Sequence, residues 1–175
     1  MSSDAVAKIT EKPEISIRPA TEADLDLILW FIHQLAIFEK APDQVTATPD
    51  LLRQNLFGPH PYAHVLLVHA KTADKMEPAG FALYFHNFST WLGRPGLYLE
   101  DLFVCPEYRN MGVGKLLLSR LAGIAREKGC GRMEWTVLDW NQPAIDFYEG
   151  VGARLLKEWI ICRVDGKSLQ EFIRM

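Results

Sequence analysis

The 175-residue sequence lacks several features that mark particular classes of protein. Its three cysteines form no Cys-x-x-Cys pair and give no disulfide framework. No apolar run reaches the roughly 18 residues of a membrane-spanning helix, and the polar first dozen residues lack the apolar core of a secretory signal. The net charge of −3 gives no basic surface for nucleic acid. We therefore expect a reduced, cytoplasmic setting without nucleic-acid or membrane partners.

Signatures of common catalytic sites are missing as well. No Gly-x-Ser-x-Gly elbow indicates a serine hydrolase. The five histidines have no ligand spacing with cysteine or aspartate, so no metal site is expected. Each cysteine is expected to be a small buried apolar residue, and none has the base partner that an acyl-enzyme route requires.

The sequence does contain enough apolar residues, 49% of the chain, for one folded domain. Residues 1–14 are charged and aperiodic, which predicts a flexible arm before a domain at 15–175. Periodicity and turn residues first predict a strand at 15–18, a helix from Thr21 that closes before Pro42, and a helix at 49–58. Three strands follow at 64–70, 79–88 and 97–105, separated by turns at 71–78 and 93–96. The rest of the chain predicts a helix at 113–128, a strand at 132–138, a short helix at 143–150, a strand at 159–164 and a last helical turn. This order implies an α/β fold whose mixed, mostly antiparallel sheet is flanked by helices.

A glycine-rich turn joins the third of the consecutive strands to the amphipathic helix. Its sequence is Arg109-Asn110-Met111-Gly112-Val113-Gly114-Lys115. Glycines let backbone N–H groups approach a ligand, and a helix start offers unpaired donors, so the turn suits a pyrophosphate. Arg109 and Lys115 can add charge-assisted bonds. A Walker loop is excluded because Arg109 and Leu116 stand where it needs Gly and Ser or Thr, and a third glycine for the dinucleotide fingerprint is missing. On spacing alone, the turn can also be a helix start without a ligand.

The pattern Arg-x-x-Gly-x-Gly between a strand and a helix resembles the acetyl-CoA motif of the GNAT N-acetyltransferase superfamily. The resemblance covers about residues 15–172. Further blocks resemble the branch of spermidine/spermine (diamine) and thialysine acetyltransferases: 17–21, 38–40, 43–45, 98–101 and 137–141. Phe-Glu-Lys at 38–40 and Leu-Asp-Trp-Asn-Gln at 138–142 look closer to the thialysine type.

The resemblance implies a GNAT-type domain with a splayed pair of cofactor-binding strands, acetyl-CoA as co-substrate and a homodimer. The implied cofactor contacts lie on the third consecutive strand, the glycine-rich turn and the start of the short helix: Leu102, Phe103, Val104, Arg109, Asn110, Met111, Gly112, Val113, Gly114, Lys115, Asn141, Gln142, Pro143 and Ala144. Three places depart from the branch. Asn110 replaces a usual Gly, Lys115 replaces a common Ser, and Lys157-Glu158-Trp159 is shorter than the usual Glu-Gly-Trp neighbourhood.

Acetyl transfer to an amine requires the deprotonated amine, and an alkyl ammonium is neutral in only about one molecule in a few thousand at pH 7. A carboxylate can bind the cation and accept its proton. Glu100 matches the family position for amine binding, and two roles stay open for it: the catalytic base or only an anchor for the amine. Asp101 faces the other side of a regular strand, so both can serve the site only at a bulge, which the family strand typically has.

The resemblance assigns the remaining roles. Tyr148 matches the tyrosine that protonates the leaving thiolate, a role suited to a phenol with a pKa near 10. Phe38, Glu39 and Trp91 match substrate-binding positions, and Trp159 matches a family aromatic near the substrate. Direct transfer in one ternary complex to a small cationic amine is the hypothesis that these residues favour. A protein lysine or N-terminal acetyltransferase and a non-catalytic CoA-binding module remain as alternatives.

Overall fold

The computed structural model describes residues 13–73 and 75–173, so nearly all of the expected N-terminal arm lies outside the described residues. The chain divides after Thr136 into two compact units. The first unit carries the sheet with three α-helices, and the second carries two short helices.

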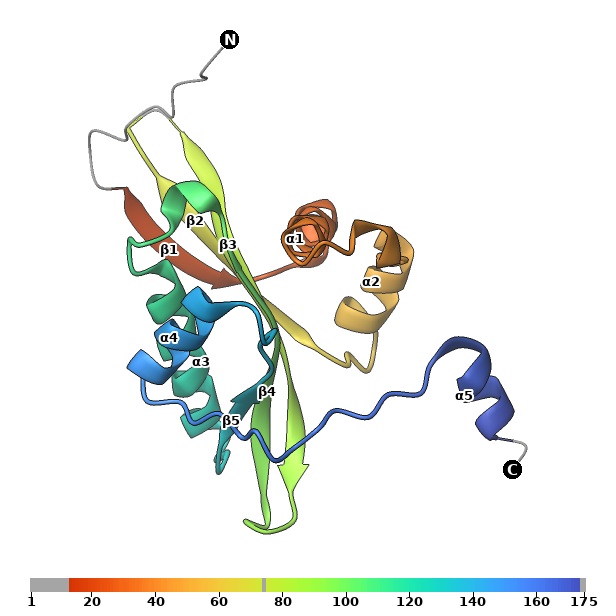
Figure 1. Cartoon of the computed structure of the whole chain (residues 1–175). Coiled ribbons are helices and arrows are strands. Elements are labelled where there is room, and N and C mark those ends of the chain that lie inside the picture. Colours follow the sequence, from red (N-terminus) through yellow and green to blue (C-terminus); the bar gives the residue numbers. More distant parts are fainter. Residues whose placement is uncertain (1–12, 74, 174–175) are drawn as a thin grey trace. The chain divides into compact units, whose positions relative to one another are not determined.

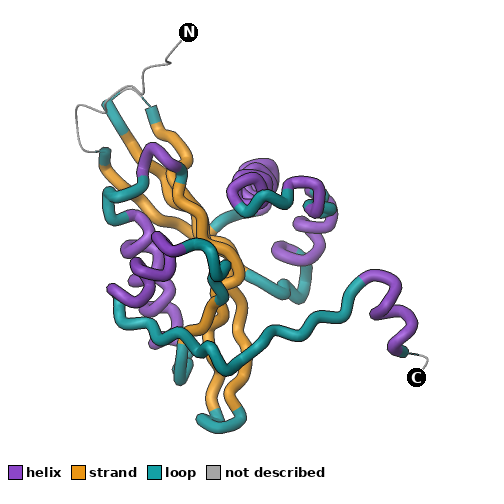
Figure 2. Tube along the Cα trace, viewed as in Figure 1, coloured by secondary structure: helices purple, strands orange, loops and turns teal. Residues whose placement is uncertain are grey.

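The first unit contains a five-stranded sheet in the order β1-β2-β3-β4-β5 (Figure 1). The strands are β1 (Glu14–Pro19), β2 (His64–Lys71), β3 (Met76–Ser89), β4 (Arg94–Val104) and β5 (Met133–Trp135). Neighbours from β1 to β4 are antiparallel, whereas β5 runs parallel to β4. Helices α1 (Leu25–Phe38) and α2 (Pro49–Phe57) lie on one side of this sheet, and α3 (Val113–Glu127) lies on the other (Figure 2). The predicted mixed, mostly antiparallel sheet with flanking helices is confirmed.

The first helical region begins with a capping box. A short 3-10 turn, Glu22–Asp24, precedes α1, and the backbone N–H of Thr21 donates to Asp24 Oδ2 at 2.8 Å. The Arg18 guanidinium, 2.7 Å from Asp24, and Thr21 hold the pKa of the Asp24 carboxyl well below its usual range. Phe31 of α1 is fully buried and stacks on Phe81 of β3 with ring centroids 5.0 Å apart. Local capping therefore starts α1, and aromatic packing fixes it over the sheet.

Helix α3 buries one stripe of apolar residues against β3 and β4. The stripe includes Val113, Leu117, Leu121 and Ile124, as its helical spacing predicts. After its end at Glu127, Gly129 takes a φ of +68°, the left-handed conformation that commonly follows a helix.

Three boundaries in the first unit differ from the sequence prediction. The turn before β4 covers Thr90–Gly93, and residues 94–96 pair with β3. Pro95 is tolerated there because the pairing of β4 with β5 begins only at Leu97. The loop between β2 and β3 shortens to 72–75, because pairing continues from Lys71 to Met76. Strand β5 ends at Trp135, so the predicted strand at 132–138 is shorter.

The second unit contains α4 (Gln142–Gly150) and α5 (Gly166–Phe172). The predicted strand at 159–164 is wrong: these residues form no strand, and Ile160 is 85% exposed. β-branched and aromatic residues favour a strand only beside a pairing partner, and the described part of this unit contains no strand. Among the residues that the structure describes, no helix has the length and apolar character needed to cross a membrane.

Candidate active site

Strand β4 carries a bulge at Glu100. Leu83 of β3 lies opposite Asp101 and Tyr84 lies opposite Leu99, so Glu100 has no opposing residue on β3. An extra residue of this kind bends the strand and lets successive side chains turn toward one site. The bulge expected from the resemblance is therefore present, and its extra residue is the candidate base.

The same stretch of β4 also loses its other neighbour. Only Leu97–Leu99 pair with β5, which ends at Trp135, whereas β4 continues to Val104. Within the described residues, no strand pairs with the β5-side edge of β4 beyond Leu99. A strand edge of this kind presents backbone N–H and C=O groups to a ligand. The edge fits the predicted cofactor contacts at Leu102, Phe103 and Val104.

The charges of two carboxylates act on a third, Asp101, at the bulge. Burial, together with the neighbouring Glu100 and Glu39 charges, raises the pKa of Asp101 to about 6. Glu39 directly follows α1, and although the residue is largely at the surface, partial desolvation raises its pKa. Glu100 itself is exposed. The end of α1 and the bulge of β4 thus form an acidic cluster of Glu39, Glu100 and Asp101, which suits a cationic ligand.

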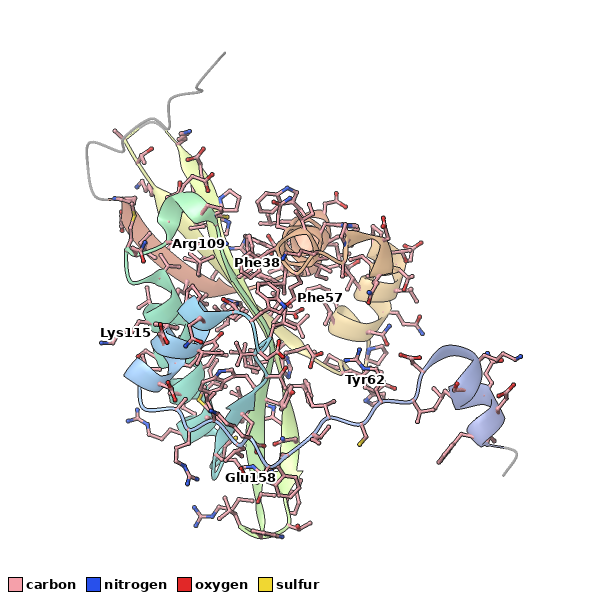
Figure 3. All side chains as sticks on the ribbon, viewed as in Figure 1. Phe38, Phe57, Tyr62, Arg109, Lys115 and Glu158 are labelled. Atoms are coloured by element: carbon pink, nitrogen blue, oxygen red, sulfur yellow. The ribbon has the colours of Figure 1, made fainter. Side chains whose placement is uncertain are left out.

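The Arg109 side chain lies at the same end of β4. Its Nε donates to the Val104 carbonyl oxygen at 3.0 Å. Its Cζ lies 5.4 Å from the ring centroid of Phe38 and 5.6 Å from that of Phe103. Figure 3 shows Arg109 beside Phe38, whereas Lys115 lies apart from both on α3. The predicted cofactor residue Arg109 therefore touches the predicted substrate residue Phe38.

The glycine-rich turn has the backbone that its sequence predicts. Asn110 and Gly112 have φ values of +60° and +85°, both in the left-handed region. Asparagine enters this region more readily than most residues, which explains how Asn110 replaces the usual Gly. A Cβ at Gly112 would meet no atom of the described residues within 4 Å beyond its chain neighbours, so this side of the turn is open among them. The first N–H groups of α3, which have no helical acceptor, complete a turn that fits a pyrophosphate.

Tyr108 is a residue of this region that the sequence prediction missed. It ends the 3-10 turn Pro106–Tyr108, is buried, and its hydroxyl donates to Glu77 Oε2 at 2.9 Å. Burial and the Glu77 carboxylate raise the pKa of Tyr108 to about 12. The tyrosine anchors the start of the glycine-rich turn to β3. Its position directly before Arg109 could have indicated a role in the turn, but its partner, Glu77, is distant in the chain and could not be predicted from the sequence.

The second unit carries the remaining predicted residues. Asn141 caps α4, as predicted, with its Oδ1 accepting from the Ala144 N–H at 3.4 Å, and Pro143 lies in the first turn. Tyr148 is a buried residue of α4 and packs against the Phe147 ring at 5.4 Å. Burial raises the pKa of its phenol, so the hydroxyl keeps its proton at neutral pH.

The structure does not bring Trp91 to the acidic cluster within one chain. Trp91 lies in the turn between β3 and β4 and is 90% exposed. From Arg94 to Glu100 the strand covers roughly 20 Å at about 3.4 Å per residue. Trp159, the other matched aromatic, is also exposed. Both substrate assignments stay predictions.

The cysteines show why a thiol nucleophile is disfavoured near this site. Burial and the Glu107 charge raise the pKa of Cys105 to about 11, which keeps it protonated. Cys105 is buried as expected and Cys130 is half-buried. The expectation is wrong for Cys162, which is exposed in the irregular segment before α5.

Comparisons with known proteins agree with this geometry. The model of the acetyltransferase (GNAT) family matches residues 29–153. A thialysine N-epsilon-acetyltransferase of Bos taurus is 39% identical over 165 residues, covering 90% of this chain and 96% of the relative. An L-ornithine N5-acetyltransferase of Arabidopsis thaliana is 34% identical, covering 88% and 86%. The solved structure of an integron cassette protein of V. cholerae is 29% identical with a TM-score of 0.73, covering 92% and 98%. The chain therefore belongs to the acetyltransferase (GNAT) family, and it is an N-acetyltransferase.

Proposed function

We propose that this enzyme transfers an acetyl group from acetyl-CoA to the terminal amine of a small cationic substrate. The substrate class is thialysine, a diamine or a polyamine, and transfer is direct within one ternary complex. The observation that carries the proposal is the acidic cluster of Glu39, Glu100 and Asp101 beside the open edge of β4. A cation site next to a place for the cofactor is what amine acetylation requires.

The chain offers two binding elements for acetyl-CoA within the first unit. The N–H groups of the turn from Arg109 to Lys115 suit the pyrophosphate, and the edge from Leu102 to Val104 suits the extended arm of the cofactor. We assign the start of α4, Asn141–Ala144, as a further contact. Bound acetyl-CoA supplies an activated thioester acetyl group. A backbone N–H on the open edge can hydrogen-bond the carbonyl oxygen of that group.

The acidic cluster binds and deprotonates the amine in this proposal. Glu39 and Asp101 attract the ammonium, and Glu100, which is exposed at the bulge, accepts its proton directly or through water. Asp101, with a pKa of about 6, is ionised at neutral pH and becomes neutral in mild acid. The cluster therefore loses attraction for the cation as the pH falls through about 6.

Tyr148 is the proposed proton donor to the leaving thiolate. Its raised pKa keeps the phenol protonated at neutral pH. Cys105 is also protonated and lacks an activating partner, which supports direct transfer over an acyl-enzyme route.

The names of the relatives narrow the substrate. Thialysine acetyltransferases and an ornithine acetyltransferase both modify an amine at the end of an amino-acid side chain. We propose thialysine first, then short diamines, and polyamines such as spermidine last. A protein lysine acetyltransferase has no specific observation in its favour.

A homodimer and a cytoplasmic location complete the proposal. The second unit exposes a run of large apolar residues that a partner can cover: Leu156, Trp159, Ile160, Ile161, Leu169 and Phe172. The free cysteines, including the exposed Cys162, suit a reducing compartment. Light scattering on the purified chain tests the dimer, because a monomeric mass at micromolar concentration contradicts it.

The decisive experiment measures initial acetylation rates with acetyl-CoA across thialysine, ornithine, lysine, putrescine, spermidine, spermine and a lysine peptide. We expect the highest kcat/KM for thialysine or a diamine. In Tyr148→Phe we expect kcat to fall by about 100-fold, because general-acid assistance typically contributes 10²–10⁴. The neighbouring Phe147→Tyr serves as a control for the hydroxyl position. Activity on the peptide alone indicates a protein acetyltransferase, and acetyl-CoA binding without turnover indicates a CoA-binding module.

A further inference from the structure

Arg109 lies between two parts of the first unit to which the sequence analysis assigns different ligands: the glycine-rich turn for the cofactor, and the end of α1 for the amine. It begins the glycine-rich turn, which is the proposed pyrophosphate site. Its guanidinium nevertheless lies against Phe38 at the end of α1 and against Phe103 of β4 (Figure 3). The side chain thus points toward the elements that carry the acidic cluster.

The contacts of Arg109 use the flat, multidentate character of a guanidinium. Its Nε donates to the Val104 carbonyl at 3.0 Å, and two aromatic rings lie within 5.6 Å of its Cζ. Both interactions depend on the planar arginine group, whose Nε–H a lysine lacks. A lysine keeps the positive charge but loses this geometry.

The two aromatic residues stand next to the carboxylates of the cluster. Phe38 directly precedes Glu39, and Phe103 lies two residues after Asp101, on the same side of the strand. Phe31 holds the middle of α1 against Phe103, with ring centroids 6.2 Å apart. Arg109 adds a contact at the end of the helix, where Glu39 begins.

We propose that Arg109 is a positioning residue for the amine site: through Phe38, Phe103 and Val104 it fixes the end of α1, and with it Glu39, against the bulge of β4. This inference rests on the proposed function, because it assigns the geometry of the acidic cluster to a residue of the cofactor turn. Substrate affinity then depends on a residue that need not touch the substrate.

The test compares Arg109→Lys, Phe38→Leu, the double variant and Phe38→Tyr, with Arg126→Lys as the matched control on the exposed face of α3. In Arg109→Lys and in Phe38→Leu we expect the KM for the best amine to rise about tenfold, a larger change than in kcat or in the Kd for acetyl-CoA. The KM of the double variant should be no higher than that of the poorer single variant, because both substitutions remove the same contact between Arg109 and Phe38. Phe38→Tyr keeps the ring that Arg109 contacts, so its KM should rise less than that of Phe38→Leu.

Two outcomes overturn the proposal. One is a weaker Kd for acetyl-CoA with an unchanged amine KM in Arg109→Lys, which assigns the side chain to the cofactor phosphate. The other is multiplicative, independent effects of Phe38→Leu and Arg109→Lys on the amine KM.

A second readout keeps the inference separate from the proposed function. The Asp101 carboxyl can be titrated by carbon NMR in the folded protein and in Arg109→Lys. Burial and Glu100 raise the Asp101 pKa more than Glu39 does, so if Arg109 holds Glu39 near Asp101, loosening Glu39 in the variant should lower the Asp101 pKa by a small amount only. An unchanged Asp101 pKa contradicts the positioning role. If the wild-type enzyme acetylates no amine, the proposed function is contradicted. The titration of Asp101 then still tests whether the contact between Arg109 and Phe38 positions Glu39.

Discussion

The two halves of β4 behave as different structures although they form one continuous strand. From Leu97 to Leu99 the strand pairs with β3 on one edge and with β5 on the other, and both leucines are buried. From Glu100 to Val104 it keeps β3 alone, after a bulge that shifts the register. The first half stabilises the sheet. The second half presents the carboxylates and an open backbone edge, so the candidate site arises where regular pairing stops.

The sharpest way to test this contrast is to neutralise one carboxylate at the bulge and another on the strand that pairs with the regular half. We expect Glu100→Gln to lower kcat/KM for the best amine by about 100-fold, because the amide can bind but cannot accept a proton. The measurement is the steady-state rate between pH 6 and 9. In the variant, kcat/KM should lose the part of its pH dependence that comes from the catalytic base.

The matched control is Glu134→Gln on β5, beside the regular half of β4 and paired with Arg132 at 2.8 Å. Its kcat/KM should stay within about twofold of the wild type. A half-exposed ion pair contributes little to the free energy of folding, so its loss should leave the folded site intact. Equal losses in the two variants would mean that the bulge has no special chemical role.

A second prediction uses two glycines that share one backbone conformation at opposite ends of α3. Gly112 and Gly129 have φ values of +85° and +68°, and within the described part of the chain a Cβ at either would meet nothing within 4 Å beyond its chain neighbours. Alanine at each should cost about 1–2 kcal/mol of folding free energy, because L residues are strained in this region. Urea unfolding measures this shared loss.

Only Gly112→Ala should weaken acetyl-CoA binding, by about tenfold, since its new methyl group would stand in the proposed cofactor space. Gly129→Ala should bind acetyl-CoA like the wild type. The same binding constant for both variants would remove the turn from the cofactor site.

The smallest expected effect on activity concerns the half-buried Asp101, whose variant should also change the pH dependence of stability. Its folded pKa of about 6 exceeds the ordinary value of 3.8, so the native state holds its proton more tightly than the unfolded chain. Stability from this group is therefore lost as the pH rises from about 4 to 6. Asp101→Asn should remove this loss, raising the unfolding free energy at pH 7 by at most about 3 kcal/mol.

In the same variant the amine KM should rise a few-fold at pH 7 and lose its step near pH 6. Thermal unfolding and KM measured from pH 4 to 8 check the two parts. A variant less stable than the wild type at pH 7 would contradict the raised pKa.

The sequence predicted what depends on neighbouring residues. Thr21 with Asp24, Thr48 before Pro49 and Asn141 each marked a helix start that the structure confirms. The glycine-rich turn was also readable, because its special φ values belong to Gly112 and to Asn110. These features are decided within a few residues of chain.

The parts that depend on distant partners were not readable from pattern alone. The bulge at Glu100 needs the register of β3, and it was expected only through the family resemblance. The contact between Arg109 and Phe38 joins residues far apart in the chain. The strand expected at 159–164 failed because alternating apolar residues do not supply a partner.

The open edge of β4 also has a consequence for the amount of enzyme in a cell. A ligand that binds only the folded chain stabilises it by about 2.7 kcal/mol at a hundred times its Kd. With acetyl-CoA as the proposed ligand, the folded fraction and the lifetime against proteolysis rise when metabolism supplies more of it. The stretch of β4 after Leu99, which is open on its β5 side, would then couple the abundance of this acetyltransferase to the supply of its own acetyl donor.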